Sequence, residues 1–510
     1  MLVKTFGSSV FGVSAHIVTV EVNIGKGAFF SLVGLPDNTI KESQYRIDAA
    51  LKNNGHKIPR KGVTINMAPA DVKKEGSAFD LTLALGILAA DEKIENERLH
   101  QYVVIGELSL DGSLRTVKGV LPIAIEAKKR GFKGILLPKG NAIEASIVDG
   151  FDVVPVASIK EAIDFLNNEF VIEPMKSDIK HTFQNNIDEI ECDFSDVKGQ
   201  ENIKRALEIS AAGGHNVILI GPPGAGKTML AKRMPSILPP LNLFEALETT
   251  KIHSVAGKLS KPLVSQRPFR APHHTVSDVA LVGGGNYPSP GEISMAHNGV
   301  LFLDELPEFK RSVLEVLRQP LEDRYITISR ARFSVDYPAS FMLIASMNPC
   351  PCGFYNHPEK ECVCSSNIVH KYMSKISGPL LDRIDLHIEV TPVPIDKLTE
   401  NSVSESSQVI RDRVIKARGI QDRRFKEVPE INCNAQMGTS IVQKVCDIHP
   451  DSLNLLRTAM KKLNLSARAY DRIIKVSRTI ADLEEEQFVL PNHMAEAIQY
   501  RSLDRNGWSG

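Results

Sequence analysis

The stretch GPPGAGKT at residues 221–228 decides the fold, because it follows an apolar run typical of a strand and precedes a run typical of a helix. Its spacing matches the phosphate-binding pattern G-x-x-x-x-G-K-[ST]. Glycines let backbone N–H groups turn toward phosphates, a lysine supplies a cation, and a threonine hydroxyl suits Mg²⁺. The residues expected to bind nucleotide are Gly221, Pro222, Pro223, Gly224, Ala225, Gly226, Lys227 and Thr228. We therefore expect ATP and Mg²⁺ as cofactors, the alternative being a chance glycine turn.

A second apolar run, GVLFLDE at residues 299–305, ends in two carboxylates. After a phosphate-binding loop, Asp304 is expected to face Mg²⁺ together with Thr228, and Glu305 to activate the attacking water. An acidic pair often only ends a strand, so this pair alone is weak. Its position downstream of the loop makes the catalytic interpretation dominant.

Two further residues are candidates for catalysis. Asn348 ends the apolar run FMLIASMN, where its side chain could sense the terminal phosphate, although it could also be a turn-forming residue before Pro349. Arg383 lies in GPLLDRIDL between Asp382 and Asp385. Spacing alone does not decide between a catalytic arginine and a surface ion pair.

Composition limits the protein class. The 510 residues allow about three domains. Apolar residues make up 43% and charged residues 24%, with Lys+Arg equal to Asp+Glu at 61 each. This balance is typical of a soluble globular protein, so any contact with nucleic acid needs a local basic patch. No secretion signal or membrane span is expected, and seven cysteines fit a reducing compartment, which predicts a cytoplasmic protein without a membrane partner.

Periodicity predicts an α/β protein of several domains. An α+β domain is expected over residues 1–170, a polar linker over 171–193, a P-loop ATPase domain over 194–395 and a helical domain over 396–510. Expected strands in the first domain are 16–24, 62–69, 102–110, 134–138 and 152–156, with helices at 43–55 and 121–131. In the ATPase domain we expect helices at 202–214, 228–234 and 310–322, strands at 216–220, 299–305 and 341–348, and a hairpin at 325–335. Ser466 is expected to start one C-terminal helix, and Pro491 to lie near the start of the last.

Four cysteines lie close together in CPCGFYNHPEKECVC. Cys350, Cys352, Cys362 and Cys364 form the pattern C-x-C-x9-C-x-C, which suits a closed tetrahedral Zn²⁺ site of structural type. His357 is a spare ligand candidate. The alternative is a group of reduced cysteines without metal. Cys192, Cys433 and Cys446 are isolated and are interpreted as packing residues.

The order of the motifs resembles the ComM/YifB family of magnesium-chelatase-like AAA+ ATPases, which are related to competence proteins. The resemblance covers essentially the whole chain and rests on RPFRAPHHTVSDVALVGGG, PGEISMAHNGVLFLDELPEF, ASMNPCPCG, GPLLDRIDL and LNLSARAYDRIIKVSRTIADL beside the phosphate loop. It implies that Asn348 is sensor 1, that Arg383 is an arginine finger acting on a neighbouring subunit's ATP, and that Arg468 is the sensor 2 arginine. It also implies a homo-oligomeric ring, commonly a hexamer.

The first domain resembles the Lon-protease-like domain, which has the ribosomal S5 domain 2-like fold. The matching segments are KKEGSAFDLTLALGILAA and GELSLDGSLRTVKGVLPIAIEAKKRG. Lon-type peptidases use a serine and a lysine, but alignment puts Ala78 and Pro122 at those positions. Ser77 is adjacent and would restore a nucleophile if the alignment slipped by one. The resemblance therefore implies a domain that is not proteolytic.

The segment between Thr228 and Asp304 resembles the helix-2 insert of this AAA+ clade, which projects toward the ring pore together with the hairpin before sensor 1. Basic side chains there could follow a phosphate backbone, and an aromatic ring could stack on a base. The candidate DNA contacts are Phe269, Arg270, Arg330 and Arg332, in an insertion that also holds Arg267, His273 and His274. The alternative is that these residues cap and pair within the insertion.

By resemblance, the function is an ATP-driven DNA motor, a helicase for branch migration on single-stranded or branched DNA during natural transformation. A chelatase-like ATPase that remodels a protein partner is the second interpretation, and a Lon-like protease the third. Residues 396–510 resemble the helical lid of magnesium-chelatase-like proteins. Their basic run, residues 409–426, is either a solvated helix face or a DNA-facing surface.

Overall fold

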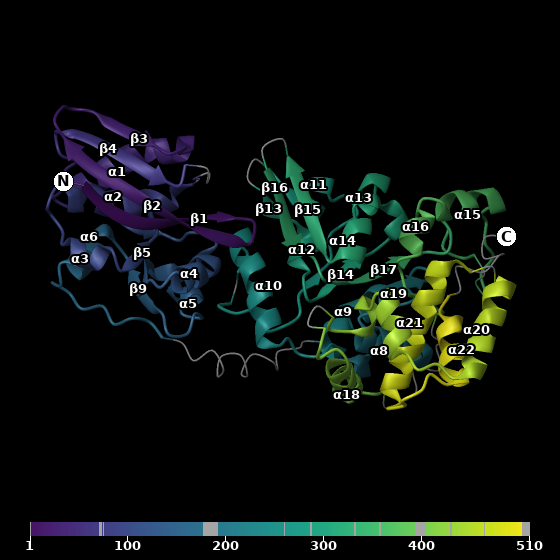
Figure 1. Ribbon diagram of the computed structural model, residues 1–510. Coiled ribbons are helices and arrows are strands. Elements are labelled where there is room, and N and C mark those ends of the chain that lie inside the picture. The colour runs from purple at the N-terminus through teal and green to yellow at the C-terminus, as the bar shows by residue number, and fades with distance from the viewer. Residues whose placement is uncertain are drawn as a thin grey trace. The chain divides into compact units, whose positions relative to one another are not determined.

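The computed structural model describes residues 2–70, 74, 76–176, 192–259, 261–285, 288–330, 333–355, 357, 359–392, 404–428, 431–463 and 465–501. The chain divides into two compact units, one of Met1–Asn186 with Leu243–Ser265 and one of Ile187–Asn242 with Gln266–Gly510. Figure 1 shows the elements in chain order. The expected fold class is confirmed, with an α+β part, a central parallel α/β part and a helical C-terminal part. Among the described residues, no helix is long and apolar enough to cross a membrane.

The first unit is built on a seven-stranded sheet with the order β3-β4-β2-β1-β5-β8-β9. Its strands are β1 (Leu2–Phe11), β2 (Ser14–Gly25), β3 (Phe30–Val33), β4 (Gly62–Ala68), β5 (Tyr102–Val104), β8 (Gly134–Pro138) and β9 (Asp152–Val156). β1, β2 and β4 pair antiparallel, whereas β5, β8 and β9 continue the sheet in parallel. The expected strand at 102–110 is shorter, because the chain leaves the sheet after Val104 and forms a separate ribbon of β6 (Glu107–Leu108) and β7 (Leu114–Arg115).

Helices cover both faces of this sheet. Its parallel strands place alternate residues in two separate cores, since successive side chains of a strand point to opposite faces. Val104 and Leu136 lie in one core, whereas Val103 and Ile135 lie in the other. The helices are α1 (Asn38–Asn53), α2 (Asp80–Ala90), α3 (Asn96–Leu99), α4 (Val120–Lys129), α5 (Ala142–Ala145) and α6 (Ile159–Leu166). α2 and α1 belong to the first core and α4 to the second.

A helix from a distant part of the sequence completes this unit. α10 (Leu243–Ala256) follows the phosphate loop in sequence but packs on α4. The carbonyl of Ser254 accepts a hydrogen bond from Gly119 N at 3.2 Å, and the Ser254 hydroxyl donates to the half-buried Glu144 carboxylate. Burial raises the pKa of Glu144, although this hydrogen bond opposes the shift. Part of the expected ATPase domain therefore belongs to the N-terminal unit.

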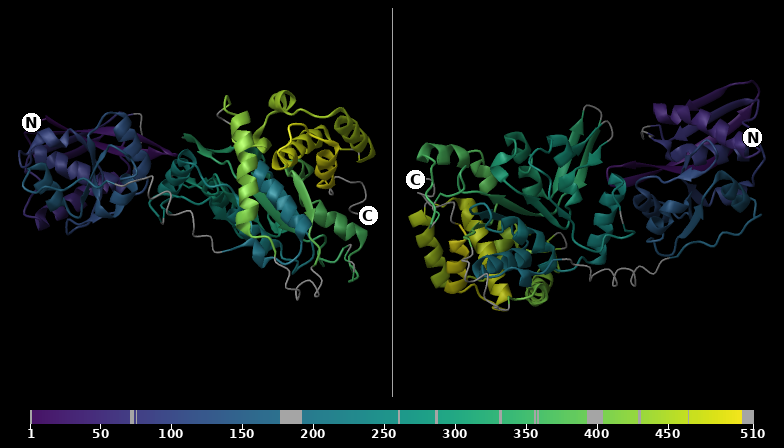
Figure 2. Two further views of the ribbon diagram at one scale, coloured as in Figure 1. Left: turned by 90° about the horizontal axis from the view of Figure 1, so that it is seen from below. Right: turned by 180° about the vertical axis from the view of Figure 1, so that it is seen from behind.

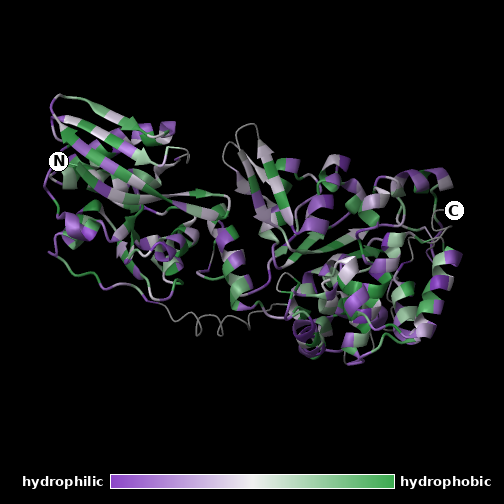
Figure 3. Ribbon diagram, viewed as in Figure 1, coloured by the Kyte–Doolittle hydropathy of each residue, from purple (hydrophilic) through white to green (hydrophobic). Residues whose placement is uncertain are grey.

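The second unit contains a five-stranded parallel sheet with the order β11-β14-β17-β10-β18. Its strands are β10 (Val217–Ile220), β11 (Phe269–Arg270), β14 (Val300–Leu303), β17 (Met342–Met347) and β18 (Leu386–Glu389). β10, β14 and β17 are buried along their whole length, and in Figure 3 this sheet is coloured as hydrophobic. Such continuous apolar strands are typical of parallel sheets covered on both faces.

Helices and two small ribbons surround the second sheet (Figure 2). The helices are α8 (Glu201–Gly213), α9 (Lys227–Ile237), α11 (Asp278–Val282), α12 (Glu292–Met295), α13 (Arg311–Glu315), α14 (Arg318–Asp323), α15 (Ser366–Met373) and α16 (Gly378–Leu381). The ribbons pair β12 (Gly283–Gly284) with β13 (Ser289–Pro290), and β15 (Tyr325–Arg330) with β16 (Phe333–Pro338). The expected hairpin is thus present, but the helix expected at 310–322 is two short helices.

The C-terminal part consists of α18 (Ser407–Arg424), α19 (Thr439–Val445), α20 (Pro450–Leu463), α21 (Ala467–Leu483) and α22 (Pro491–Gln499). Both start signals are confirmed, because Ser466 caps α21 by accepting a hydrogen bond from Ala469 N, and Pro491 is the first residue of α22. α18 and α21 pack on α8, so the described part of this region shares one hydrophobic core with the sheet.

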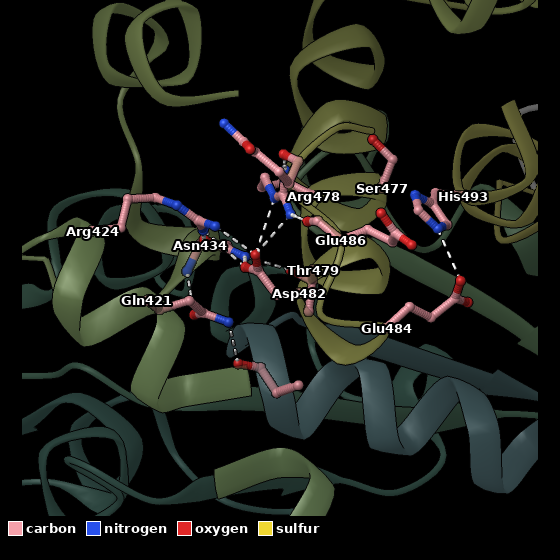
Figure 4. A network of polar contacts seen from close by, with 12 residues as sticks. Gln421, Arg424, Asn434, Ser477, Arg478, Thr479, Asp482, Glu484, Glu486 and His493 are labelled. Carbon is pink, nitrogen blue, oxygen red and sulfur yellow. Dashed lines mark hydrogen bonds and ion pairs between the residues drawn. The ribbon is translucent and has the colours of Figure 1, made fainter. Parts of the chain in front are cut away.

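A buried polar network holds these C-terminal helices together (Figure 4). Asp482 of α21 accepts hydrogen bonds from Arg424 at 2.8 Å, from Arg478 at 3.0 Å and from Asn434 at 2.7 Å. Gln421 links the same network to α8 by donating to the Ala212 carbonyl at 3.1 Å. A buried carboxylate that is paired and hydrogen-bonded in this way fixes the relative position of α18 and α21.

Candidate active site

The phosphate loop connects the carboxyl end of β10 to the start of α9. Gly224 and Gly226 have φ angles of 78° and 84°, in the left-handed region that favours glycine. Gly221 is packed so closely that a Cβ would lie 2.2 Å from the carbonyl oxygen of Val390. The loop is therefore the strand, turn and helix unit predicted from the sequence, and its glycines are required by backbone conformation and packing.

Lys227 lies at the centre of this loop. Its Nζ donates to the carbonyls of Gly221 at 2.7 Å and Pro222 at 2.9 Å, and to the Asn348 side-chain oxygen at 3.1 Å. Burial lowers the pKa of Lys227, whereas the nearby charges of Asp304 and Glu305 oppose the shift. Asn348 directly follows β17, the strand beside β10, so the expected sensor and the loop lysine are in direct contact.

The threonine and the first carboxylate are also in contact. Thr228 Oγ1 donates to Asp304 Oδ2 at 2.7 Å, and Ser346 donates its hydroxyl to the other oxygen of Asp304. Hydroxyl and carboxylate oxygens are the ligands that Mg²⁺ prefers, so Thr228 and Asp304 are suitably placed to hold it beside phosphates. Sequence reasoning missed Ser346, which is fully buried in the structure. The available signal was a serine within an otherwise apolar run that predicts a buried strand.

Glu305 has a different environment from its neighbour. Its backbone is in the left-handed conformation, with φ of 53°, and 57% of its side chain is exposed. One carboxylate oxygen lies 3.6 Å from His274 Nδ1, and the His274 ring packs against His273 at 4.0 Å between centroids. The sequence placed His274 among the residues of the insertion but did not indicate this pairing with Glu305.

Arg383 is almost buried and pairs within its own chain. Its guanidinium lies 2.6 Å from the Glu322 carboxylate of α14 and donates to the Pro379 carbonyl at 2.5 Å. The flanking aspartates take other partners, because Asp382 lies 3.7 Å from Arg468 and Asp385 lies 2.9 Å from Arg472. Arg383 therefore does form an ion pair within the chain, but with Glu322 rather than with the flanking aspartates.

Arg468 and Arg472 lie one turn apart on α21. The Arg468 side chain is 58% exposed, whereas Arg472 and Asp385 form an inward-facing pair. Burial alone would raise the pKa of Asp385, but Arg472 and His215 hold it well below its ordinary value. The segment with Arg383 and the helix with Arg468 are thus joined by two ion pairs.

The four clustered cysteines come together as predicted. Their sulfur atoms all lie within 4.8 Å of one another, with no disulfide among them. His357 is not part of this group, because its Nδ1 accepts hydrogen bonds from Glu359 N and Lys360 N, both at 3.1 Å. The structure therefore gathers the four thiols but leaves the spare ligand candidate aside.

The candidate DNA contacts of the insertion have partners within the chain. Phe269 lies in β11 and stacks on Phe302 at 6.0 Å between ring centroids, and Arg270 pairs with Glu292 at 2.5 Å. These contacts favour the alternative that both residues serve the fold of the insertion, since a ring packed in the core is not available to stack on a base. Arg330 ends β15 at the tip of the hairpin. Arg332 lies outside the described residues.

In the N-terminal unit, the positions that correspond to a Lon dyad carry no reactive groups. Ala78 lies in a short helix, Ser77–Phe79, and Pro122 packs in the first turn of α4. The adjacent Ser77 donates its hydroxyl to the Glu107 carboxylate, whose further partner is Arg115 at 3.7 Å. Ser77 is thus bound to a carboxylate, where a Lon-type serine would need a lysine.

Comparisons with known proteins agree with this geometry. A family model described as magnesium chelatase, subunit ChlI, matches residues 193–398, one described as subunit ChlI of Mg-chelatase matches 20–141, and one described as magnesium chelatase, subunit ChlI C-terminal, matches 404–501. Competence protein ComM of Haemophilus influenzae is 44% identical over 507 residues, which cover 99% of this chain and 98% of the relative. The chain belongs to the ComM/YifB family. Its sequence-based assignment is confirmed.

Other relatives extend the comparison of this ComM/YifB chain. The uncharacterized protein YifB of Escherichia coli is 43% identical over 499 residues, 97% of this chain and 96% of the relative. Lon protease 2 of Bacillus subtilis is 29% identical over 151 residues, 28% of this chain and 27% of the relative. Membership in the ComM/YifB family makes this protein a magnesium-chelatase-type AAA ATPase.

Proposed function

We propose that this protein is a ring-forming motor that hydrolyses ATP and moves branched DNA, so that it acts as a branch-migration helicase on incoming DNA. The observation that carries the proposal is the meeting of Lys227, Asp304 and Asn348 at one end of the sheet, in a chain that resembles a competence protein over its full length. Phosphoryl transfer is catalysed mainly by positioning and charge, and these groups supply both.

In this mechanism, Lys227 and the loop N–H groups bind the phosphates, and Thr228 with Asp304 holds Mg²⁺. Mg²⁺ bound by these two side chains would supply positive charge beside the phosphates. Glu305 accepts the proton of the attacking water, for which it must leave His274. Asn348, already within 3.1 Å of Lys227, orients the terminal phosphate and the water.

The proposal gives Arg383 a role at a neighbouring subunit's ATP within a ring, and gives Arg468 the role of the sensor 2 arginine. A cation aimed at the transferred phosphoryl group lowers the barrier only when it is positioned. Release of Arg383 from Glu322 is then a necessary step, because the ion pair at 2.6 Å occupies the guanidinium. The four cysteines would hold a structural Zn²⁺, and a basic surface that includes Arg330 and Arg332 would contact single-stranded or branched DNA.

The second candidate is an ATPase that remodels a protein partner, as the chelatase descriptions suggest. Three chelatase models match the chain, including one over residues 20–141, so the N-terminal domain does not by itself favour the DNA motor. A proteolytic function is not favoured, because Ala78 and Pro122 lack the groups for it.

The discriminating experiment is strand exchange on a synthetic four-way DNA junction with ATP. The wild-type protein is expected to move the junction and to hydrolyse ATP faster when the junction is present. Lys227→Ala is the matched control and is expected to do neither. Junctions that stay in place, together with ATP hydrolysis that is indifferent to DNA, would favour the remodelling function.

A further inference from the structure

The four-cysteine cluster has the spacing of a zinc site. Cys350 and Cys352 sulfurs are 3.3 Å apart, Cys350 and Cys362 3.7 Å, and Cys352 and Cys362 3.5 Å. Zinc–sulfur bonds of about 2.3 Å in a tetrahedron place the sulfurs about 3.8 Å apart. A disulfide would require about 2.05 Å. Four sulfur ligands fill the coordination shell, so such a metal would be structural.

The segment that carries the cysteines is not held by regular secondary structure. Between β17, which ends at Met347, and α15, which begins at Ser366, its described residues form neither helix nor strand. Cys350 is fully buried, but Cys352, Cys362 and Cys364 are only partly covered. A chain of this kind loses much conformational entropy on ordering, and a metal clip that closes it offsets this loss.

This segment touches the phosphate loop. Gly353 follows Cys352 in a turn in which its N–H donates to the Cys350 carbonyl at 3.0 Å, and it has a φ angle of 86°. A Cβ at this position would lie 2.5 Å from Pro223 Cδ. The backbone between the first two cysteines and the second proline of the nucleotide-binding loop are thus in close contact.

The segment also holds Asn348 from two sides. Cys350 follows Asn348 by two residues in the chain. From the other end, Tyr372 of α15 is buried beside Asn348: burial raises the pKa of its hydroxyl, and the nearby Asn348 backbone opposes that shift. The side chain of Asn348, in turn, contacts Lys227. A bridge among the four sulfurs therefore connects both flanks of Asn348.

We infer that a Zn²⁺ bound by Cys350, Cys352, Cys362 and Cys364 braces the nucleotide site, so that zinc occupancy sets the affinity for ATP. With the metal, Gly353 is held against Pro223 and Asn348 against Lys227. Without it, the segment opens and both contacts loosen. Because binding free energies are reciprocal, bound nucleotide also tightens the hold on zinc. The inference rests on the ATP-binding function proposed above and not on DNA as the substrate.

The test combines zinc content with equilibrium binding of a fluorescent, non-hydrolysable ATP analogue, measured on the full chain. Wild-type protein is expected to carry one zinc per chain. Cys362→Ser is expected to lose zinc and to bind the analogue on the order of tenfold more weakly, a typical coupling between sites. Cys192→Ser, a cysteine outside the cluster, is the matched control and is expected to match the wild type.

Gly353→Ala tests the contact with Pro223 separately from zinc binding. Its methyl group collides with Pro223 but leaves all four thiols, so this variant is expected to keep zinc and still lose affinity for the analogue. If Cys362→Ser fails to fold, the same measurement is made on wild-type protein stripped of zinc by a chelator and then reloaded. A zinc-free protein with unchanged affinity would overturn the inference, as would wild-type protein without zinc. A zinc-loaded wild type that binds no nucleotide would instead contradict the ATPase function.

Discussion

The two acidic residues after β14 are neighbours in sequence but differ in how they are held. Asp304 is fixed by the hydroxyls of Thr228 and Ser346. Glu305 has a left-handed backbone and a largely exposed side chain, and among the partners described for its carboxylate it meets only the ring of His274. A carboxylate held by hydroxyls suits a metal site, whereas an exposed carboxylate can be reached by a water beside the phosphates. Substitutions of the two should therefore have different consequences.

Glu305→Gln is expected to slow ATP hydrolysis by at least about 10²-fold, because a positioned general base contributes roughly 10²–10⁴-fold. ATP binding is expected to stay near that of the wild type. Asp304→Asn should instead weaken the dependence of binding on Mg²⁺. Single-turnover hydrolysis and Mg²⁺ titration of nucleotide binding measure the two effects. Loss of binding in Glu305→Gln would contradict the assignment.

Arg383→Ala is expected to lose hydrolysis by roughly 10³-fold, as for arginine fingers in other systems, while it binds ATP nearly as well as the wild type. The sharper measurement mixes this variant with Lys227→Ala. Each is inactive alone, but in mixed rings an intact phosphate loop meets an intact arginine across a subunit boundary. Recovery of ATPase activity on mixing is expected, and its absence with proven mixing would indicate that Arg383 acts within its own subunit.

At this scale, the sequence predicted the residues of short motifs and missed their partners. Lys227, Thr228 and Asp304 meet because parallel strands bring their carboxyl ends together, which the motif spacing already implies. Glu322, the partner of Arg383, lies 61 positions earlier in the chain. No local pattern marks it. Likewise, Phe269 was a candidate for base stacking because the sequence around a single aromatic residue does not show whether its ring packs in the core or lies on the surface.

Among the elements, α21 buries three charged side chains, Lys475, Arg478 and Asp482. Arg478 and Asp482 are paired, but Lys475 is 9% exposed and its ammonium group meets only the distant carbonyl of Ala435, at 3.4 Å, as a hydrogen-bond partner among the described residues. Burial and the like charge of Arg472 lower the pKa of Lys475 to about 8, although Asp385 opposes this. The lysine therefore costs stability at neutral pH.

Lys475→Met is expected to stabilise the fold on the order of 3 kcal/mol at pH 7, since each pKa unit is worth about 1.4 kcal/mol. The folded chain releases this proton above pH about 8, but the unfolded chain holds it to about 10.5. Wild-type stability therefore rises with pH through that window, and the advantage of the variant should shrink there. Thermal melts from pH 7 to 9 measure it. A constant difference would show that Lys475 does not titrate.

Elements with strong periodicity followed the prediction, and elements decided by distant partners did not. α8 and α21 begin within one residue of the expected positions, because apolar spacing and the Ser466 cap are local signals. The basic run of α18 was interpreted as solvated or facing DNA. Lys416, Arg423 and Lys426 are exposed, whereas Arg413 pairs with Glu208 of α8 and Arg424 with Asp482 of α21, which are long-range partners that charge patterning cannot reveal.

On the scale of the whole molecule, the N-terminal unit is assembled from two separate stretches of chain. Residues up to 176 supply its sheet, and α10 supplies the helix that covers α4. The sequence indicated an insertion after the phosphate loop but did not predict that its helix packs on α4. The apolar side chains of a helix show that it is partly buried, but not which surface it covers. In the chain, α10 lies between α9 and β11 of the second unit. The polypeptide therefore enters and leaves the N-terminal unit through the two ends of α10.

A protease site placed within residues 177–191, which lie outside the described part of the chain, tests this assembly. After cleavage, the two fragments are expected to elute together in size-exclusion chromatography, because α10 on the second fragment remains packed on α4 of the first. Ile252→Asp, which places a carboxylate at a fully buried position of α10, is expected to let them separate. Separation of the cleaved wild-type protein would contradict the role given to α10.

The path of α10 also bears on the ancestry of the protein. A domain that is joined to its neighbour at one point can be gained by end-to-end fusion of two genes. Here two separate stretches of the chain form the N-terminal unit. Fusion of residues 1–176 alone to the rest of the protein would have left α4 without the helix that covers it. We therefore expect residues 1–176 and 243–265 to have been inherited together, and homologues that lack the N-terminal unit to carry a shortened or altered segment in place of α10.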